Sequence, residues 1–328
     1  MNDLPPEAAF MPIEAVEKRQ RSQARRQQQP SVPRIGPREL GEADGVRDPA
    51  TWTGAIPGRQ WLVTGLIPLD QVTMITGNGG EGKSLIAAQL AASAVTGMSW
   101  LGHDVKQVKS AIVHCEDDED EMKRRLNGIL EPQGHSFGDL DDLILIDRDG
   151  KDDSLMYEAM NNDTLGRFTD FYARLEATVA KERIRLLVLD SLYNFFGGNE
   201  NMRPQVTQFV GGLKRIAKTY GCAVVVIAHP GRAGMSQGGD GTSGSTAWHN
   251  AVRSRFYLHR RKHPSGDPDK KGPLVFEHMK ANYGPKEGAI EIFYDRGRFV
   301  PTVDPPAPAS EPQDDLPFDN SNFGSRHD

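Results

Sequence analysis

The 328-residue chain contains only two cysteines, too few for a disulfide framework. Cys115 and Cys222 both stand inside apolar runs, where a buried and inert thiol is the usual state. No segment approaches the roughly 18 consecutive apolar residues of a membrane span, and acids and prolines stand where a signal peptide has its apolar region. These absences predict a soluble protein of a reducing cytoplasm that does not enter a membrane.

An excess of positive charge is also missing, since 39 Lys and Arg face 45 Asp and Glu for a net charge of -6. Any binding of nucleic acid therefore needs a local basic surface rather than bulk charge. Aliphatic residues are scarce at both ends. We expect residues 1–50 to form a disordered basic arm with room for one short helix (14–29), and residues 301–328 a disordered acidic tail. Residues 51–300 then form one large domain.

The stretch Gly77-Asn78-Gly79-Gly80-Glu81-Gly82-Lys83-Ser84 fits the P-loop pattern G-x-x-x-x-G-K-[ST] without a mismatch. An apolar strand pattern (72–76) precedes it and an Ala-rich helix pattern (84–94) follows, which disfavours a glycine-rich turn that binds nothing. Backbone N–H groups and Lys83 are expected to hold the phosphates of ATP, with the helix N-terminus pointing at them, and Ser84 to hold Mg²⁺. The predicted nucleotide contacts are Gly77, Asn78, Gly79, Gly80, Glu81, Gly82, Lys83, Ser84 and Leu85.

Apolar strand patterns then alternate with helix patterns, which is typical of an α/β fold whose mostly parallel sheet is covered by helices. We expect strands at 110–115, 143–146, 184–189 and 222–228, and helices at 126–130, 163–181 and 203–220. Four later segments alternate in polarity and are interpreted as antiparallel hairpin additions to one edge of the sheet; they are 252–258, 274–279, 290–294 and 299–300.

Two acids end apolar strands and are therefore candidates for the catalytic centre. Asp190 follows the most apolar strand after the P-loop, where a Walker-B carboxylate would complete the Mg²⁺ site. Glu116 follows a neighbouring strand, at the edge where open α/β sheets bind ligands, and could activate a water molecule. It competes for this role with its neighbours Asp117, Asp118 and Glu119, because an acidic run is often only a solvated surface.

His229 ends the strand at 222–228 and could sense the γ-phosphate, although a histidine at a strand end is often structural. A glycine-rich segment (231–244) follows it, too long for an ordinary connection. With these motifs in this order, the chain resembles the RecA-type P-loop ATPases of the RepA family, the hexameric replicative helicases of broad-host-range plasmids. The further residues that carry the resemblance are Cys115-Glu116-Asp117, Leu187-Val188-Leu189-Asp190-Ser191-Leu192, Gly221-Cys222, Gly244-Ser245-Thr246 and Lys280-Ala281-Asn282-Tyr283-Gly284.

The resemblance implies a RecA-like core in which Glu116 is the catalytic glutamate, Asp190 the Walker-B acid and His229 a conformational sensor. Arg253 matches an arginine that acts across the subunit interface of a hexameric ring. Asn282 departs from the Lys-x-Arg of related helicases, although Lys280 is kept, so the trans-acting cation is left open among Arg253, Arg255 and Lys280. The resemblance also places two segments (193–202 and 231–244, the latter with Arg232) toward a channel that binds single-stranded DNA.

Three functional classes follow from these motifs. The first is a ring ATPase that moves on single-stranded DNA as a replicative-type helicase. The second is an ATP-dependent switch or loader that binds DNA without unwinding it, because the channel segments contain few basic residues. A metabolic P-loop kinase is disfavoured, since no acceptor-binding lid is recognisable. In the tail, residues 313–318 resemble short peptides that dock on replication partners, although a purely solubilising tail stays the simpler interpretation.

Overall fold

The computed structural model describes residues 41–42, 45–160, 164–229, 246–263, 265–267 and 270–303. The chain divides into two units, residues 1–57 and 58–328. The described part of the first unit contains one short 3₁₀ helix, η2 (Pro49–Thr51), whose N-terminus is capped by the Asp48 side chain. The predicted arm helix (14–29), the glycine-rich segment (231–244) with Arg232, and the tail peptide (313–318) lie outside the described residues.

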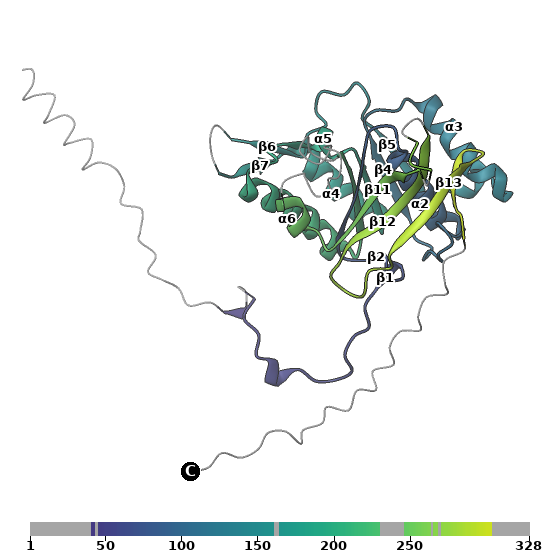
Figure 1. The fold of residues 1–328 in the computed structure, drawn as a ribbon. Coiled ribbons are helices and arrows are strands. Elements are labelled where there is room, and N and C mark those ends of the chain that lie inside the picture. Colours follow the sequence, from purple (N-terminus) through teal and green to yellow (C-terminus); the bar gives the residue numbers. More distant parts are fainter. Residues whose placement is uncertain are drawn as a thin grey trace, which may run out of the picture. The chain divides into compact units, whose positions relative to one another are not determined.

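A nine-stranded sheet forms the centre of the second unit, with strand order β14-β13-β12-β11-β3-β10-β8-β4-β5 (Figure 1). The strands from β11 to β5 pair in parallel, and β12, β13 and β14 add antiparallel pairs on one side. The predicted α/β fold with a mostly parallel sheet is confirmed. The strands are β3 (Val72–Gly77), β4 (Ser110–His114), β5 (Leu143–Asp147), β8 (Leu186–Asp190), β10 (Ala223–Ala228), β11 (Ser254–Lys262), β12 (Lys271–Ala281), β13 (Ala289–Asp295) and β14 (Arg298–Pro301).

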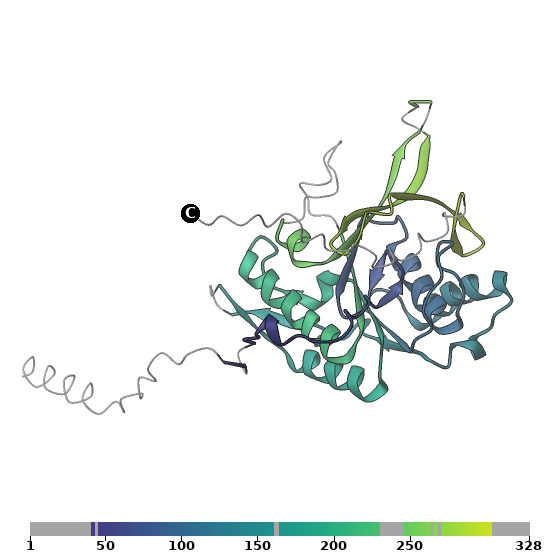
Figure 2. The ribbon, with the colours of Figure 1, turned by 90° about the horizontal axis from the view of Figure 1, so that it is seen from below.

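Helices cover both faces of the sheet and enclose a separate apolar core on each (Figure 2). One face holds α2 (Lys83–Thr96), α3 (Glu119–Leu130), η3 (Glu131–Gln133) and η4 (Phe137–Leu140). The other face holds α4 (Asp170–Glu182), α5 (Leu192–Phe195), α6 (Arg203–Tyr220) and α7 (Thr246–Ala251). In α6 the apolar side chains recur every three or four residues and are buried as one stripe. Within the described ranges, no helix combines the length and apolar character that crossing a membrane requires.

Two small sheets accompany the large one: β1 (Trp61–Val63) pairs with β2 (Ile67–Pro68), and β6 (Tyr157–Ala159) lies between β7 (Gly166–Phe168) and β9 (Phe196–Gly197). The prediction of one helix from 163 to 181 is therefore wrong in its first part. Gly166 lies so close to the Glu158 carbonyl that a Cβ would collide with it, and this pairing holds the segment extended. The helix α4 begins only after Thr169, whose hydroxyl caps it by accepting from Tyr172 N.

The strand β11 also differs from its prediction as an antiparallel edge addition, because it pairs in parallel with β3 on one side and antiparallel with β12 on the other. Residues 254–258 are all buried, including Ser254 and Arg255 at 2% and 4% exposure. The polar residues that alternate with apolar ones in β11 are therefore buried and hydrogen-bonded rather than exposed to solvent. Ser254 donates to the Leu66 carbonyl at 2.8 Å.

Burial of His278 makes the stability of the fold sensitive to acid. The ring lies on β12, stacked on Phe256 at 4.4 Å, and burial lowers its pKa to about 4 from an ordinary value of 6.5. The unfolded chain therefore binds more protons than the folded chain between these two values, and stability is lost as the pH falls through this window.

We expect His278→Phe, which keeps an aromatic ring beside Phe256, to reduce this pH dependence. Urea unfolding at pH 7.5 and pH 5.0 should show that the wild type loses about 2 kcal/mol more than the variant over this interval. The same loss in both proteins would mean that His278 is not the acid-sensitive group.

Candidate functional site

A cleft of about 450 Å³ opens at the carboxyl ends of β3, β4, β8 and β10, within the range usual for small-ligand sites. It brings together predicted residues from Gly80 to His229, because the parallel strands all end on the same side of the sheet. The predicted site residues that line it are Gly80, Gly82, Lys83, Ser84, Leu85, Glu116, Asp190 and His229.

The glycines of the P-loop are required by packing as well as by the backbone path. Gly82 has φ +91°, and a Cβ on it would lie 2.6 Å from the Phe299 ring of β14. At Gly77, a Cβ would collide with the backbone carbonyl of Leu258 on the neighbouring β11. One side of the loop is therefore packed closely against the C-terminal strands β11 and β14.

Lys83 begins α2, and its side chain folds back over the loop. The ammonium donates to the Asn78 carbonyl at 2.8 Å and lies 3.4 Å from His229 Nδ1. Burial lowers the pKa of Lys83, against the opposing effects of Asp190, Glu116 and Glu81. A phosphate group bound here would provide the negative charge that a buried ammonium needs.

Ser84 and Asp190 provide oxygen atoms of the kind that Mg²⁺ prefers. Asp190 ends β8, and a hydrogen bond joins its carboxylate to the Ser84 side chain; burial raises its pKa to about 6. The described residues contain no group of three or more His, Cys, Asp and Glu that could hold a metal alone. Mg²⁺ usually takes one or two protein ligands together with phosphate oxygens. The two residues therefore fit Mg²⁺ bound together with a nucleotide.

The four acids that compete for the water-activating role have different surroundings. Asp117 forms an ion pair with Arg125, and Asp118 caps α3 by accepting from Glu121 N at 2.7 Å. Glu119 pairs with Lys123 one turn along that helix. Of the four, only Glu116 is among the side chains lining the cleft, where it accepts a hydrogen bond from Ser191 Oγ at 3.1 Å. These surroundings favour Glu116 over its neighbours.

His229 follows β10 directly and lines the cleft beside Lys83. Desolvation and the nearby ammonium lower the pKa of His229. A neutral imidazole at this position can accept from Lys83 or contact a phosphate oxygen, depending on its tautomer.

Several residues that line the cleft were not predicted from the sequence. Arg124 and Arg125 reach it from α3, Tyr294 from the end of β13, and Gly297 from the turn between β13 and β14. Tyr294 is 65% exposed. No motif marks these positions, and Tyr294 and Gly297 belong to strands that join the sheet far from the P-loop in sequence.

Arg253 lies near the amino ends of the parallel strands, whereas the cleft lies at their carboxyl ends. In the pairing of β11 with β3, Leu258 stands beside Gly77, and Arg253 precedes Leu258 by five positions, roughly 16 Å along the chain. Asn282 holds it there: with its amide oxygen turned toward the guanidinium, Asn282 accepts from Arg253 Nη1 at 3.1 Å and donates to the Arg253 carbonyl at 3.3 Å. Arg253 is thus positioned away from the P-loop of its own chain.

The two other candidate cations differ in accessibility. Arg255 is buried and contacts Thr76 Oγ1 at 3.5 Å and His249 Nδ1 at 3.3 Å, so it faces inward. Lys280 donates to the His249 carbonyl at 2.7 Å, at the end of α7. Burial lowers the pKa of Lys280, and the charges that add to this effect are all cations, namely Arg253, Lys214 and Arg255. Lys280 is therefore surrounded by other cations on this side of the sheet.

Comparison with known families adds one match: a family model described as an AAA domain matches residues 40–235, which is more than half of the chain. The matched range contains the P-loop, Glu116, Asp190 and His229, the residues that the fold gathers in the cleft.

The close approach of Gly77 to β11 predicts an effect on stability that differs from that of its neighbour. We expect Gly77→Ala to reduce the free energy of unfolding by about 2 kcal/mol or more, because the methyl group must displace a backbone carbonyl. Gly79→Ala is the matched control, since nothing lies within 4 Å of its Cβ position. Urea unfolding of both variants checks this, and equal losses would contradict the packing argument.

Proposed function

Since the chain belongs to the AAA-domain family of P-loop ATPases, we propose that it is a ring-forming ATPase that acts on single-stranded DNA as a replicative-type helicase. The proposal rests mainly on one observation: the candidate catalytic groups lie at opposite ends of the parallel strands. The P-loop, Glu116 and Asp190 share the cleft at the carboxyl ends of the strands, whereas Asn282 holds Arg253 near their amino ends. An active site completed by a second copy of the chain accounts for this division.

Within one cleft, each side chain has a role that its surroundings support. Lys83 and the P-loop amides hold the β- and γ-phosphates of ATP, and Glu116 takes the proton of the attacking water while Ser191 orients its carboxylate. Ser84 and Asp190 would hold Mg²⁺, which neutralises charge on the phosphate oxygens. Tyr294 and Arg125 line the cleft beyond the P-loop and are suited to contact the base of the nucleotide.

In the proposed ring, Arg253 acts on the ATP of the neighbouring copy. Charge that develops on the γ-phosphoryl oxygens is stabilised by a cation, and a cation supplied by a neighbour couples hydrolysis to assembly. Arg255 is buried in its own chain, which favours Arg253, with Lys280 close by, as the trans-acting group. Asn282, which stands where related helicases have the arginine of Lys-x-Arg, then orients Arg253.

The action on DNA rests on the resemblance of the ordered motifs to the RepA family. An ATP-dependent switch or loader that does not unwind DNA remains the second candidate, favoured by the net charge of -6. Strand displacement on a forked DNA distinguishes the two, alongside ATP hydrolysis with and without single strands. Hydrolysis that responds to single strands without displacement would support the switch.

Substitution of the acids tests the chemistry of the cleft. We expect Glu116→Gln to keep ATP binding but to lower turnover by about 10²–10⁴-fold, because the amide does not take a proton from water. Asp117→Asn is the control, since it removes a carboxylate that is paired with Arg125. Steady-state hydrolysis and equilibrium binding of ATP are measured for both. A larger loss in Asp117→Asn would assign the base to Asp117 instead.

The role of Arg253 predicts complementation between variants. We expect Arg253→Ala to bind ATP but to lose hydrolysis, and a mixture with Glu116→Gln to regain activity at interfaces that combine an intact Glu116 with an intact Arg253. Asn282→Ala should lower turnover less, since the guanidinium is present but no longer oriented. Activity per chain that does not change with protein concentration, or mixtures that stay inactive, would count against a shared site.

A further inference from the structure

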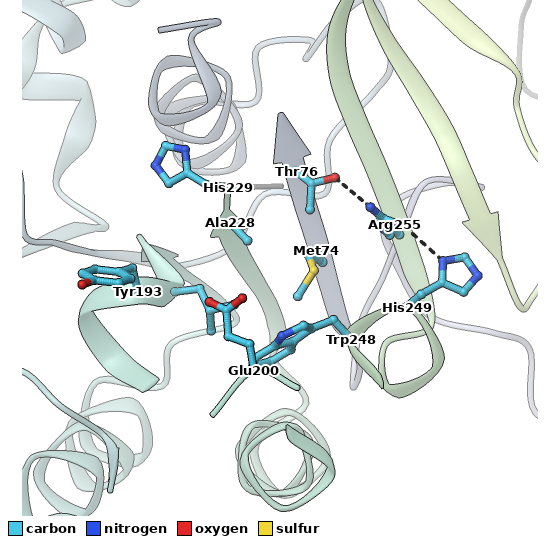
Figure 3. A pocket seen from close by; sticks show the side chains of 10 residues that line it. Met74, Thr76, Tyr193, Glu200, Ala228, His229, Trp248, His249 and Arg255 are labelled. Atoms are coloured by element: carbon cyan, nitrogen blue, oxygen red, sulfur yellow. Dashed lines mark hydrogen bonds between the residues drawn. The ribbon is translucent and has the colours of Figure 1, made fainter. Parts of the chain in front are cut away.

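A second pocket, of about 90 Å³, adjoins the nucleotide cleft on the side of α5 and α7 (Figure 3). Its apolar lining comes from Met74, Leu192 and Ala228. His229 lines both this pocket and the nucleotide cleft, so a ligand bound here lies next to the residue that contacts Lys83.

The inner part of the pocket is lined by two buried side chains that carry hydrogen-bond donors, Trp248 and Arg255. Trp248 is 6% exposed, and its indole Nε1 is buried without a hydrogen-bond partner among the described residues. Edge contacts with Phe196 at 5.2 Å and Phe209 at 6.1 Å hold the ring in place. Arg255 is 4% exposed and is held by Thr76 and His249. The Trp248 N–H has no acceptor among the described residues, and a buried donor in that state is costly, which favours a ligand that supplies an acceptor.

The outer part of the pocket has a different chemistry. Tyr193 is 79% exposed, and Glu200 contributes a carboxylate that accepts hydrogen bonds. Figure 3 shows Tyr193 and Glu200 on one side of the pocket and Arg255 and His249 on the other, with Trp248 between them. The complementary ligand is therefore small and flat, with acceptors at one end and a donor at the other.

We propose that this pocket binds one unstacked base of single-stranded DNA and prefers cytosine. The inference rests on the proposed action on single strands. The O2 and N3 atoms of cytosine accept hydrogen bonds from the side of Trp248 and Arg255, its exocyclic amine donates to Glu200, and Tyr193 provides a stacking surface. Thymine carries an acceptor where cytosine has the amine and would face the carboxylate unfavourably. The small volume favours one ring over the two of a purine.

Equilibrium binding of labelled 20-nucleotide strands of dC and dT tests the proposal, at one salt concentration and with a non-hydrolysable ATP analogue. We expect the wild type to bind dC about tenfold more tightly than dT. Glu200→Gln should lose this preference, because an amide also donates to the thymine O4. Glu131→Gln is the matched control, since it removes the same charge from an exposed position outside the pocket and should keep the preference.

Tyr193→Ala should weaken binding of both strands by roughly tenfold or more, since stacking does not depend on the base. The dependence of affinity on salt should be the same in wild type and Glu200→Gln, because contacts to phosphates are unchanged. Thermal unfolding and ATP binding are recorded for each variant, so that a loss of DNA binding is measured on folded protein.

Equal affinity of the wild type for dC and dT, or a preference that survives Glu200→Gln, would overturn the base pocket while leaving the ATPase on single strands intact. A wild type that binds neither strand, and whose hydrolysis of ATP does not respond to them, would overturn the proposed function itself. The two failures are therefore distinguishable in one set of measurements.

Discussion

The packing of the P-loop against the C-terminal strands is the constraint on which the rest of the site depends. Gly77 lies against a backbone carbonyl of β11, and Gly82 against the Phe299 ring of β14. Gln89, one turn and a half into α2, is 2% exposed and bonds both the N–H and the carbonyl of Phe299, at 3.0 and 2.9 Å. Strands more than 170 residues away in the sequence thereby fix the position of the phosphate loop and of the helix behind it.

Electrostatics then decide what the cleft is suited to bind. Burial disfavours the charged forms of both Lys83 and Asp190, and each is close enough to the other for their charges to interact. A bound ATP with Mg²⁺ would supply an opposite charge to each of them, namely a polyphosphate to the ammonium and a cation to the carboxylate. At the opposite ends of the strands, burial and the charges of Arg253, Lys214 and Arg255 lower the pKa of Lys280. The proposed contact between copies would join these two ends.

His229 is the point at which the two pockets meet. It contacts Lys83 on one side and lines the pocket with Trp248 and Glu200 on the other. A residue in this position can transmit the occupancy of one site to the other with a small change of orientation, because both ligands would contact the same ring. Such coupling is what an ATPase needs if its state is to depend on a second ligand.

Local patterns in the sequence were enough to predict the P-loop, the parallel strands and the helix α6, since each depends on residues close together in the chain. They also placed Glu116 and Asp190 at one edge, because parallel strands end together. The tertiary structure alone decided that β11 runs parallel beside β3, that Tyr294 lines the cleft and that Arg255 is buried. These features depend on pairing between distant segments, where register and burial are set by packing that no local pattern encodes.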